Sequence, residues 1–290
     1  MRFLIRGLMQ GCCVLMLGFS LPVLSDEVIE SDPADKKIER IITLSPSSTE
    51  MLFDIGVGDR LVGTVEHTDF PDAAKSLPRI GNYAGLNIER IVALEPDLIV
   101  AWKSGNKQSD LEKLESLGLP ITYVDPKSMT AVRDAIERLG KEVGEEALGK
   151  AAAERFDRAY QALRAEYGSK EFVRVFYQLS YQPLRTVGEG SWVEALIHDC
   201  NGDNVFHDAD APYPVVSLES IIVKDPEVII MSSHTNAIQS RDAVWERWPN
   251  ISAVKNGAMI PINSSTLLRS GPRAIEGMAL LCKAIDRVRD

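Results

Sequence analysis

The chain has 290 residues, a length that suggests about two globular units. Apolar residues make up 45% and charged residues 26% of the composition, which excludes a disordered chain, a collagen-like repeat and a protein with many membrane spans. Acidic residues outnumber basic residues by 42 to 32, and the net charge of −10 argues against a nucleic-acid partner, because phosphates would be repelled.

The N-terminal segment predicts a signal peptide. Arg2 and Arg6 form a basic start, a short apolar run follows, and small or branched residues precede a cleavage point after Ser25. The apolar run is too short to span a bilayer. A buried N-terminal helix and a lipoprotein start at Cys12 are the alternatives. We therefore expect residues 1–25 to direct export to an oxidising compartment.

Two cysteines remain after the predicted cleavage, Cys200 and Cys282. An even pair in an exported chain most simply forms one disulfide, and two free buried thiols are the alternative. A bond across this long separation would stabilise the fold by roughly 2–4 kcal/mol. Cleavage also removes two basic side chains and no acidic ones, so the mature chain is more acidic than the precursor.

The first part of the mature chain alternates short apolar strands with helices. Residues 26–37 are acidic and polar, which is typical of a flexible leader. Ser47 and Glu50 have the spacing of a capping box at the start of the first helix, and Gly56 ends that helix. The alternation predicts a mostly parallel sheet with helices on both faces. Strands are expected at residues 38–44, 61–65, 98–102 and 121–124, and helices at 88–94 and 111–117.

The second part of the chain repeats this scheme. Residues 88–100 and 218–230 share Glu, Ile, Pro and Ile at the same places, and both read as a helix, a proline turn and a strand. A chance match of two αβ units is the alternative, but the matched order of elements predicts two related lobes. Further strands are expected at 173–177, 228–231 and 258–262, and further helices at 192–199 and 272–288.

One long helix is expected to connect the two parts. Apolar residues at helical spacing predict a continuous helix over residues 145–167, on the order of 34 Å long. The predicted fold class is α/β, with two Rossmann-like lobes on mostly parallel sheets joined by this helix. The expected divisions are an N-terminal lobe at 38–143, a linking helix at 144–168 and a C-terminal lobe at 169–290, with small hinge motion between the lobes.

The sequence lacks the common catalytic motifs. It has no Walker A loop, no glycine-rich dinucleotide loop after a strand and no nucleophile elbow. Its four histidines, His67, His198, His207 and His234, have no spacing typical of a metal cluster. The sequence therefore predicts a protein that is not an enzyme and holds no resident cofactor.

Several aromatic residues lie in loops that should meet at one cleft. Open α/β sheets bind ligands beyond the carboxyl ends of their strands, and His67 also follows a predicted strand. Exposed aromatic rings there favour a flat, apolar ligand. Arg269 is a candidate donor to polar groups on such a ligand, with a solvated surface arginine as the alternative. The aromatic residues are Phe70, Tyr83, Trp102 and Tyr213.

Glu89 and Glu219 occupy the same place in the two repeated segments, at helix starts. Acidic residues there are stabilised by the helix dipole, which explains each residue separately. Equivalent carboxylates on two related lobes also suit a twofold partner with a basic residue on each half.

At these positions the chain resembles the helical-backbone substrate-binding proteins of ABC importers, a family that carries haem, ferric siderophores and cobalamin, and within it the cobalamin binders. The resemblance covers about residues 38–288. Its clearest stretches are Ile42-Thr43-Leu44-Ser45-Pro46 with Thr49-Glu50, residues 89–94 with Pro96-Asp97-Leu98, Ala101-Trp102 with Gly105-Asn106, Cys200 with Gly202 and 204–206, Pro214 with Val216-Ser217, and Arg269 with Pro272-Arg273.

The resemblance implies a periplasmic receptor, monomeric, that clamps cobalamin or a related corrinoid between its lobes and passes it to a permease dimer in the inner membrane. Glu89 and Glu219 then match the glutamates that dock on permease arginines, and Cys200 and Cys282 match the family disulfide. The resemblance also assigns two sets of residues to the ligand pocket. Ser45, Pro46 and Ser47 approach the ligand with their backbone. The pocket side chains are Tyr83, Trp102, Tyr213 and Arg269, where Tyr83 and Tyr213 stand in place of tryptophan.

The chain also departs from the cobalamin binders. His67 stands in place of a tyrosine, Ser265 in place of an aspartate, and Arg185 in place of an aromatic residue. A histidine near cobalt or iron either coordinates the metal as an axial contact or packs beside it. Haem or a ferric siderophore therefore stays open as the alternative ligand.

Overall fold

The computed structural model describes residues 37–233 and 242–289. The predicted signal peptide, His234 and the leader up to residue 36 lie outside the described residues. None of the helices in the described part of the chain is long and apolar enough to cross a membrane.

The strands are β1 (Ile41–Thr43), β2 (Leu61–Gly63), β3 (Gly81–Asn82), β4 (Gly85–Leu86), β5 (Leu98–Ala101), β6 (Ile121–Tyr123), β7 (Val173–Gln178), β8 (Ser180–Tyr181), β9 (Leu184–Arg185), β10 (Gly202–Asn204), β11 (Val228–Ser233) and β12 (Met259–Asn263).

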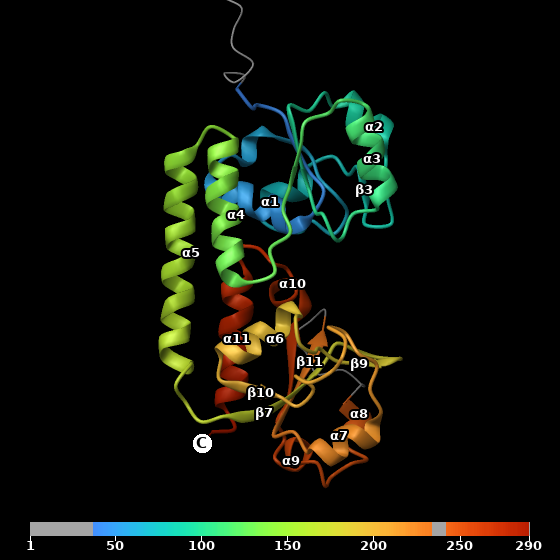
Figure 1. Ribbon diagram of the computed structural model, residues 1–290, viewed down its shortest axis with the longest axis vertical. Coiled ribbons are helices and arrows are strands. Elements are labelled where there is room, and N and C mark those ends of the chain that lie inside the picture. Colours follow the sequence, from blue (N-terminus) through green and yellow to red (C-terminus); the bar gives the residue numbers. More distant parts are fainter. Residues whose placement is uncertain (1–36, 234–241, 290) are drawn as a thin grey trace, which may run out of the picture. The chain divides into compact units, whose positions relative to one another are not determined.

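Helices separate most of these strands (Figure 1). The α-helices are α1 (Pro46–Ile55), α2 (Ile88–Ala93), α3 (Gln108–Ser116), α4 (Met129–Glu142), α5 (Glu146–Tyr167), α6 (Trp192–Asp199), α7 (Leu218–Lys224), α8 (Asp242–Trp245), α9 (Ser252–Lys255), α10 (Ser264–Leu267) and α11 (Ala274–Asp286); short 3₁₀ turns lie at η2 (Gly58–Arg60) and η3 (Asp72–Ser76).

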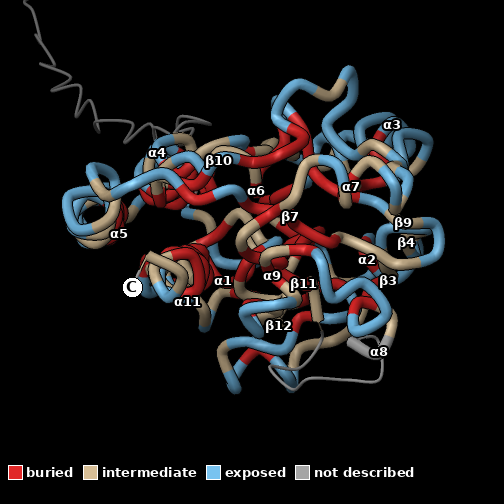
Figure 2. Tube along the Cα trace, turned by 90° about the horizontal axis from the view of Figure 1, so that it is seen from below, coloured by how far each residue is buried: buried red, intermediate tan, exposed pale blue. Residues whose placement is uncertain are grey.

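Two four-stranded parallel sheets have the same topology. The first has the strand order β2-β1-β5-β6 and the second β10-β7-β11-β12. All four residues of β5 are buried, and Figure 2 shows β7 and β11 buried along most of their length. Because helices cover both faces, β5 and the first four residues of β11 are continuous apolar runs, whereas β7 is interrupted by the exposed Arg174. The predicted α/β class with mostly parallel sheets is confirmed.

The two sheets also repeat one another at the turn before the third strand of each. Glu95 and Asp225 take positive φ angles of 46° and 42° at matching positions. Arg40 Nε donates to the Glu95 carbonyl at 3.2 Å, and Arg174 Nε donates to the Asp225 carbonyl at 3.0 Å. The similar segments at residues 88–100 and 218–230 therefore adopt equivalent local structures, which supports a common origin for the two halves.

The long helix was predicted at residues 145–167, and α5 spans Glu146–Tyr167. It packs against α4, and also against α1 and α11, which belong to different halves of the chain. Figure 1 shows α4 and α5 side by side. A Cβ at Gly140 would clash with the backbone of Gly149, so glycines permit this close approach.

Helix α4 was not predicted, although Ser128 caps it and its buried side chains lie at helical spacing. One buried apolar cluster includes Ile41, Phe156 and Phe176, so the core continues from the first sheet past α5 to the second. The division into lobes at residues 143 and 168 stays a prediction.

The predicted capping box at the first helix is wrong. Ser45 is the N-cap, its Oγ accepts from the Ser48 backbone N–H at 3.2 Å, and Pro46 is the first helical residue. Proline suits this position because the missing N–H would have no helical partner there. Ser47 therefore lies inside the helix, and Glu50 is buried instead of folding back on the cap.

The predicted disulfide between Cys200 and Cys282 is confirmed. Cys200 caps the C-terminus of α6 and Cys282 lies in α11. Both residues are fully buried. The bond therefore joins α11, the last helix of the chain, to the end of α6.

Candidate functional site

The carboxyl edge of the first sheet carries three of the predicted ligand residues. Ser45 follows β1, His67 follows β2 and Trp102 directly follows β5. These strands are neighbours and parallel, so their ends open on the same edge. This is the position where open α/β sheets bind ligands.

Asn106 joins the loops after β1 and β5. Its Nδ2 donates to the Leu44 carbonyl at 2.8 Å, and its Oδ1 accepts from the Trp102 backbone N–H at 2.7 Å. Asn106 itself is buried. The backbone before Ser45 and the backbone of Trp102 are therefore held in a fixed relation.

The indole of Trp102 is held in place but remains open to solvent. Trp102 as a residue is 38% exposed, and its ring packs over Gly105, where any Cβ would overlap it. Its Nε1 donates to Asp125 Oδ1 at 3.0 Å. Burial raises the pKa of Asp125, but hydrogen bonds from Lys127, Ser104 and Trp102 outweigh burial and lower it. The acceptor of the indole N–H therefore stays ionised.

A cluster of buried hydroxyl groups lies beneath this edge. Thr43 Oγ1 is 2.6 Å from Thr49 Oγ1 and 3.0 Å from Thr64 Oγ1, and Thr64 Oγ1 is 3.0 Å from Thr68 Oγ1. All four are buried. The cluster links the end of β1 to the loop that carries His67. These residues were not predicted from the sequence, because isolated threonines form no motif.

Residues 66–70 form a loop that two arginines from near the end of the chain hold in place. His67 is exposed and has a φ of 64°. Arg269 Nη2 donates to the His67 carbonyl at 2.9 Å, and Arg269 Nη1 donates to Asp69 Oδ1 at 2.5 Å. The Arg273 guanidinium lies 4.3 Å from the ring centroid of Phe70. The structure therefore brings the predicted residues His67, Phe70 and Arg269 together.

Glu50 completes this ion cluster. Its side chain is 1% exposed and accepts from Arg269 at 3.2 Å and from Arg273 at 2.8 Å. Burial raises the pKa of Asp69, but the Arg269 hydrogen bond and charge outweigh burial and lower it. Two carboxylates thus balance two guanidinium groups. Arg269 is only 16% exposed, so the alternative of a solvated surface arginine is wrong.

Four other predicted residues lie apart from this cluster. Tyr83 lies in the turn between β3 and β4 and is 71% exposed, and Tyr213 is 49% exposed. Arg185 Nη1 donates to the Tyr213 carbonyl at 3.1 Å. The Ser265 backbone N–H donates to Asn263 Oδ1 at the start of α10. Among the described residues, no ring contact joins Tyr83, Trp102 and Tyr213.

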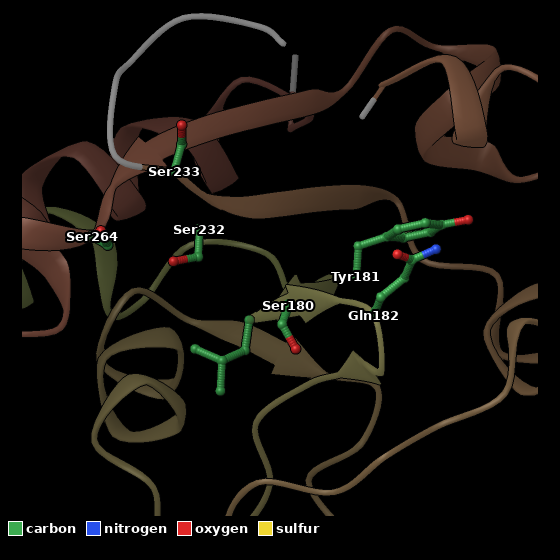
Figure 3. A pocket seen from close by; sticks show the side chains of 7 residues that line it. Ser180, Tyr181, Gln182, Ser232, Ser233 and Ser264 are labelled. Carbon is green, nitrogen blue, oxygen red and sulfur yellow. The ribbon is translucent and has the colours of Figure 1, made fainter. Parts of the chain in front are cut away.

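A cavity of about 380 Å³ lies at the carboxyl edge of the second sheet (Figure 3). It is lined from the ends of β7 and β11, from the β8–β9 hairpin and from the start of α10. These residues were not predicted from the sequence, although some of them lie at the ends of predicted strands. The lining residues are Leu179, Ser180, Tyr181, Gln182, Ser232, Ser233 and Ser264.

Glu89 and Glu219 lie in the first turns of α2 and α7, the matching helices of the two halves. Both glutamates are exposed. Asn87 and Ser217 cap these helices by accepting a hydrogen bond from the backbone N–H three residues later. The two carboxylates are thus free of the capping interactions and open to solvent.

A family model described as "periplasmic binding protein" matches residues 41–266. The chain belongs to the periplasmic binding protein family. Members of this family bind solutes for transport and are not catalytic, which agrees with the prediction that the chain is not an enzyme. Within the described part of this periplasmic binding protein, no group of three His, Cys, Asp or Glu residues is placed to hold a metal ion.

Individual relatives are similar over nearly their whole length. The vitamin B12-binding protein of Vibrio campbellii is 37% identical over 275 residues, which cover 94% of this chain and 98% of the relative. The crystal structure of the periplasmic vitamin B12-binding protein BtuF of Vibrio cholerae superposes with a TM-score of 0.79 at 36% identity, covering 87% of this chain and 98% of BtuF. The periplasmic haem-binding protein RhuT from Roseiflexus sp. RS-1 has a TM-score of 0.76 at 23% identity, covering 87% of this chain and all of RhuT, a likeness that shows the fold alone.

Proposed function

We propose that this protein captures cobalamin or a related corrinoid in the periplasm and delivers it to an ABC permease. The observation that carries the proposal is the 37% identity to a vitamin B12-binding protein over 94% of the chain. The exposed rings of Tyr83, Trp102 and Tyr213 support it, because a broad macrocycle needs large apolar contacts. Cobalamin is the transported ligand in this proposal and not a resident cofactor.

We place the ligand against loops from both halves. The first sheet contributes the fixed loops after β1 and β5, and the second half contributes Arg185, Tyr213 and Ser265. Because Arg269 is engaged with Glu50 and Asp69, its main role is to position the loop of His67. The proposed ligand residues are Ser45, Pro46, Ser47, His67, Phe70, Tyr83, Trp102, Arg185, Tyr213, Ser265 and Arg269.

His67 favours a metal-centred ligand. Its imidazole is exposed, while its carbonyl is fixed by Arg269 and its neighbour Thr68 is buried. A neutral imidazole is a good ligand for cobalt and for iron. This residue is the specific reason to keep haem or a ferric siderophore as the second candidate.

Titration of the purified mature protein with cyanocobalamin tests the proposal. We expect a dissociation constant well below ~10 µM, and weaker binding would contradict it. Haemin is the parallel ligand. If haem is the true ligand, the protein shows a Soret band that shifts when His67 is replaced by alanine, and cyanocobalamin does not compete.

Delivery to the permease is tested with the double variant Glu89→Ala/Glu219→Ala. We expect the affinity for cyanocobalamin to stay unchanged, since neither residue is a proposed ligand contact. Uptake by cells that depend on this receptor should fall at least about tenfold, because each lost carboxylate leaves a basic residue of the partner unpaired.

Glu146→Ala is the matched control for the docking variant, since Glu146 is an exposed acid in the first turn of another helix, α5. Its uptake should equal that of the unmodified protein. Normal uptake by the double variant would rule out the proposed docking surface.

A further inference from the structure

The cavity at the carboxyl edge of the second sheet has an unusual chemical character. Its volume is about 380 Å³, and the described residues that line it carry, apart from Leu179, a hydroxyl group or a carboxamide, and none of them is charged. Figure 3 shows Ser232 and Ser233 on one side and Tyr181 and Gln182 on another. Such a lining offers both hydrogen-bond donors and acceptors to a neutral ligand.

The β8–β9 hairpin, which carries Tyr181 and Gln182, is stabilised by its own hydrogen bonds. Ser180 pairs with Arg185 across the hairpin, and Ser180 Oγ donates to the Pro183 carbonyl at 2.8 Å. The nearby cation, Arg185, donates to the Tyr213 carbonyl. Arg185 is not one of the residues that line the cavity, and none of the described lining residues carries a charge, so the lining itself supplies no counter-charge.

The residues at the end of β7, beneath the cavity, are buried and uncharged. Gln178, at the end of β7, is buried and its Oε1 accepts from Trp245 Nε1 at 2.7 Å. Tyr177 is fully buried, and burial raises the pKa of its phenol, so it stays neutral. A carboxylate that enters this cavity loses water without gaining a cation from the described lining residues, which is costly.

We propose that this cavity selects uncharged amide side arms of the ligand and rejects carboxylates at the same place. The inference rests on the proposed function, because the edge of a corrin ring bears carboxamide arms, whereas haem bears propionates. An amide donates to and accepts from the hydroxyls of Ser232 and Tyr181 and the carboxamide of Gln182. The cavity therefore separates corrinoids from haem by charge, while the aromatic rings would stack on either macrocycle.

The test compares cyanocobalamin with its separate monocarboxylic acid isomers, in which one side-arm amide is hydrolysed. The unmodified protein should bind at least one isomer about tenfold or more weakly than cyanocobalamin, since a buried group left unpaired is costly. In the Gln182→Lys variant that isomer should bind more tightly than before, and cyanocobalamin more weakly. Gln182 is exposed, so the added lysine fits without repacking the core.

Gln108→Lys is the control, because it makes the same charge change at an exposed position on α3. It should alter neither affinity. Equal binding of cyanocobalamin and every isomer by the unmodified protein would overturn the inference and leave the proposed function standing. A failure to bind any of these corrinoids would overturn the proposed function and the inference with it.

Discussion

Replacing Glu50 with alanine is expected to lower the free energy of unfolding by about 3–5 kcal/mol, the cost of breaking a buried ion pair from one side. The Glu50 side chain is 1% exposed and accepts from both Arg269 and Arg273. Without it, two largely buried guanidinium groups share only Asp69, which is half exposed. Urea unfolding followed by circular dichroism measures the change.

Asp69→Ala is the matched control for this variant. It removes a carboxylate from the same cluster, but Asp69 is 52% exposed, so solvent replaces much of the lost interaction. We expect a loss of about 1 kcal/mol or less there. An unfolding free energy for Glu50→Ala within about 1 kcal/mol of the unmodified protein would show that the cluster does not stabilise the fold.

Loss of the Cys200–Cys282 bond is expected to lower the stability by about 2–5 kcal/mol. The bond closes a separation of 82 residues, so it strongly restricts the unfolded chain. The double variant Cys200→Ala/Cys282→Ala avoids placing new polar groups at two fully buried positions. Thermal unfolding of the variant and the unmodified protein, each with and without reductant, measures the effect.

The reductant supplies the control for this experiment. It should lower the melting temperature of the unmodified protein toward that of the variant, and it should leave the variant unchanged. Equal melting temperatures for the oxidised protein and the variant would contradict a stabilising role for the bond.

The alternation of strands and helices was predictable because local signals agreed with the tertiary structure. The apolar run of β5 is buried on both faces, and the repeat in α2–β5 and α7–β11 places both glutamates on matching helices. Helix α4 was missed although Ser128 marks its start. Its pairing with α5 is a tertiary feature that no single window of sequence contains.

The role of Glu50 could not be predicted from the neighbouring sequence alone. A serine followed three residues later by a glutamate has the same spacing in a capping box and in this buried cluster. The deciding partners, Arg269 and Arg273, lie 219 and 223 residues further along the chain. The uncharged cavity at the second sheet was not predicted for a similar reason. Its serines lie far apart in the sequence, and only the folded sheet brings them together at the ends of its strands.

The distance along the chain between Glu50 and its arginines also constrains how the polypeptide matures. The α1 carboxylate lacks its counter-charges until Arg269 and Arg273 are in place, near the C-terminus. Contacts of such long range form late, because the loop they close is costly in entropy. A chain that emerges N-terminus first from a translocation channel would therefore complete this ion cluster, and fix the loop of His67, only after the last segment has emerged.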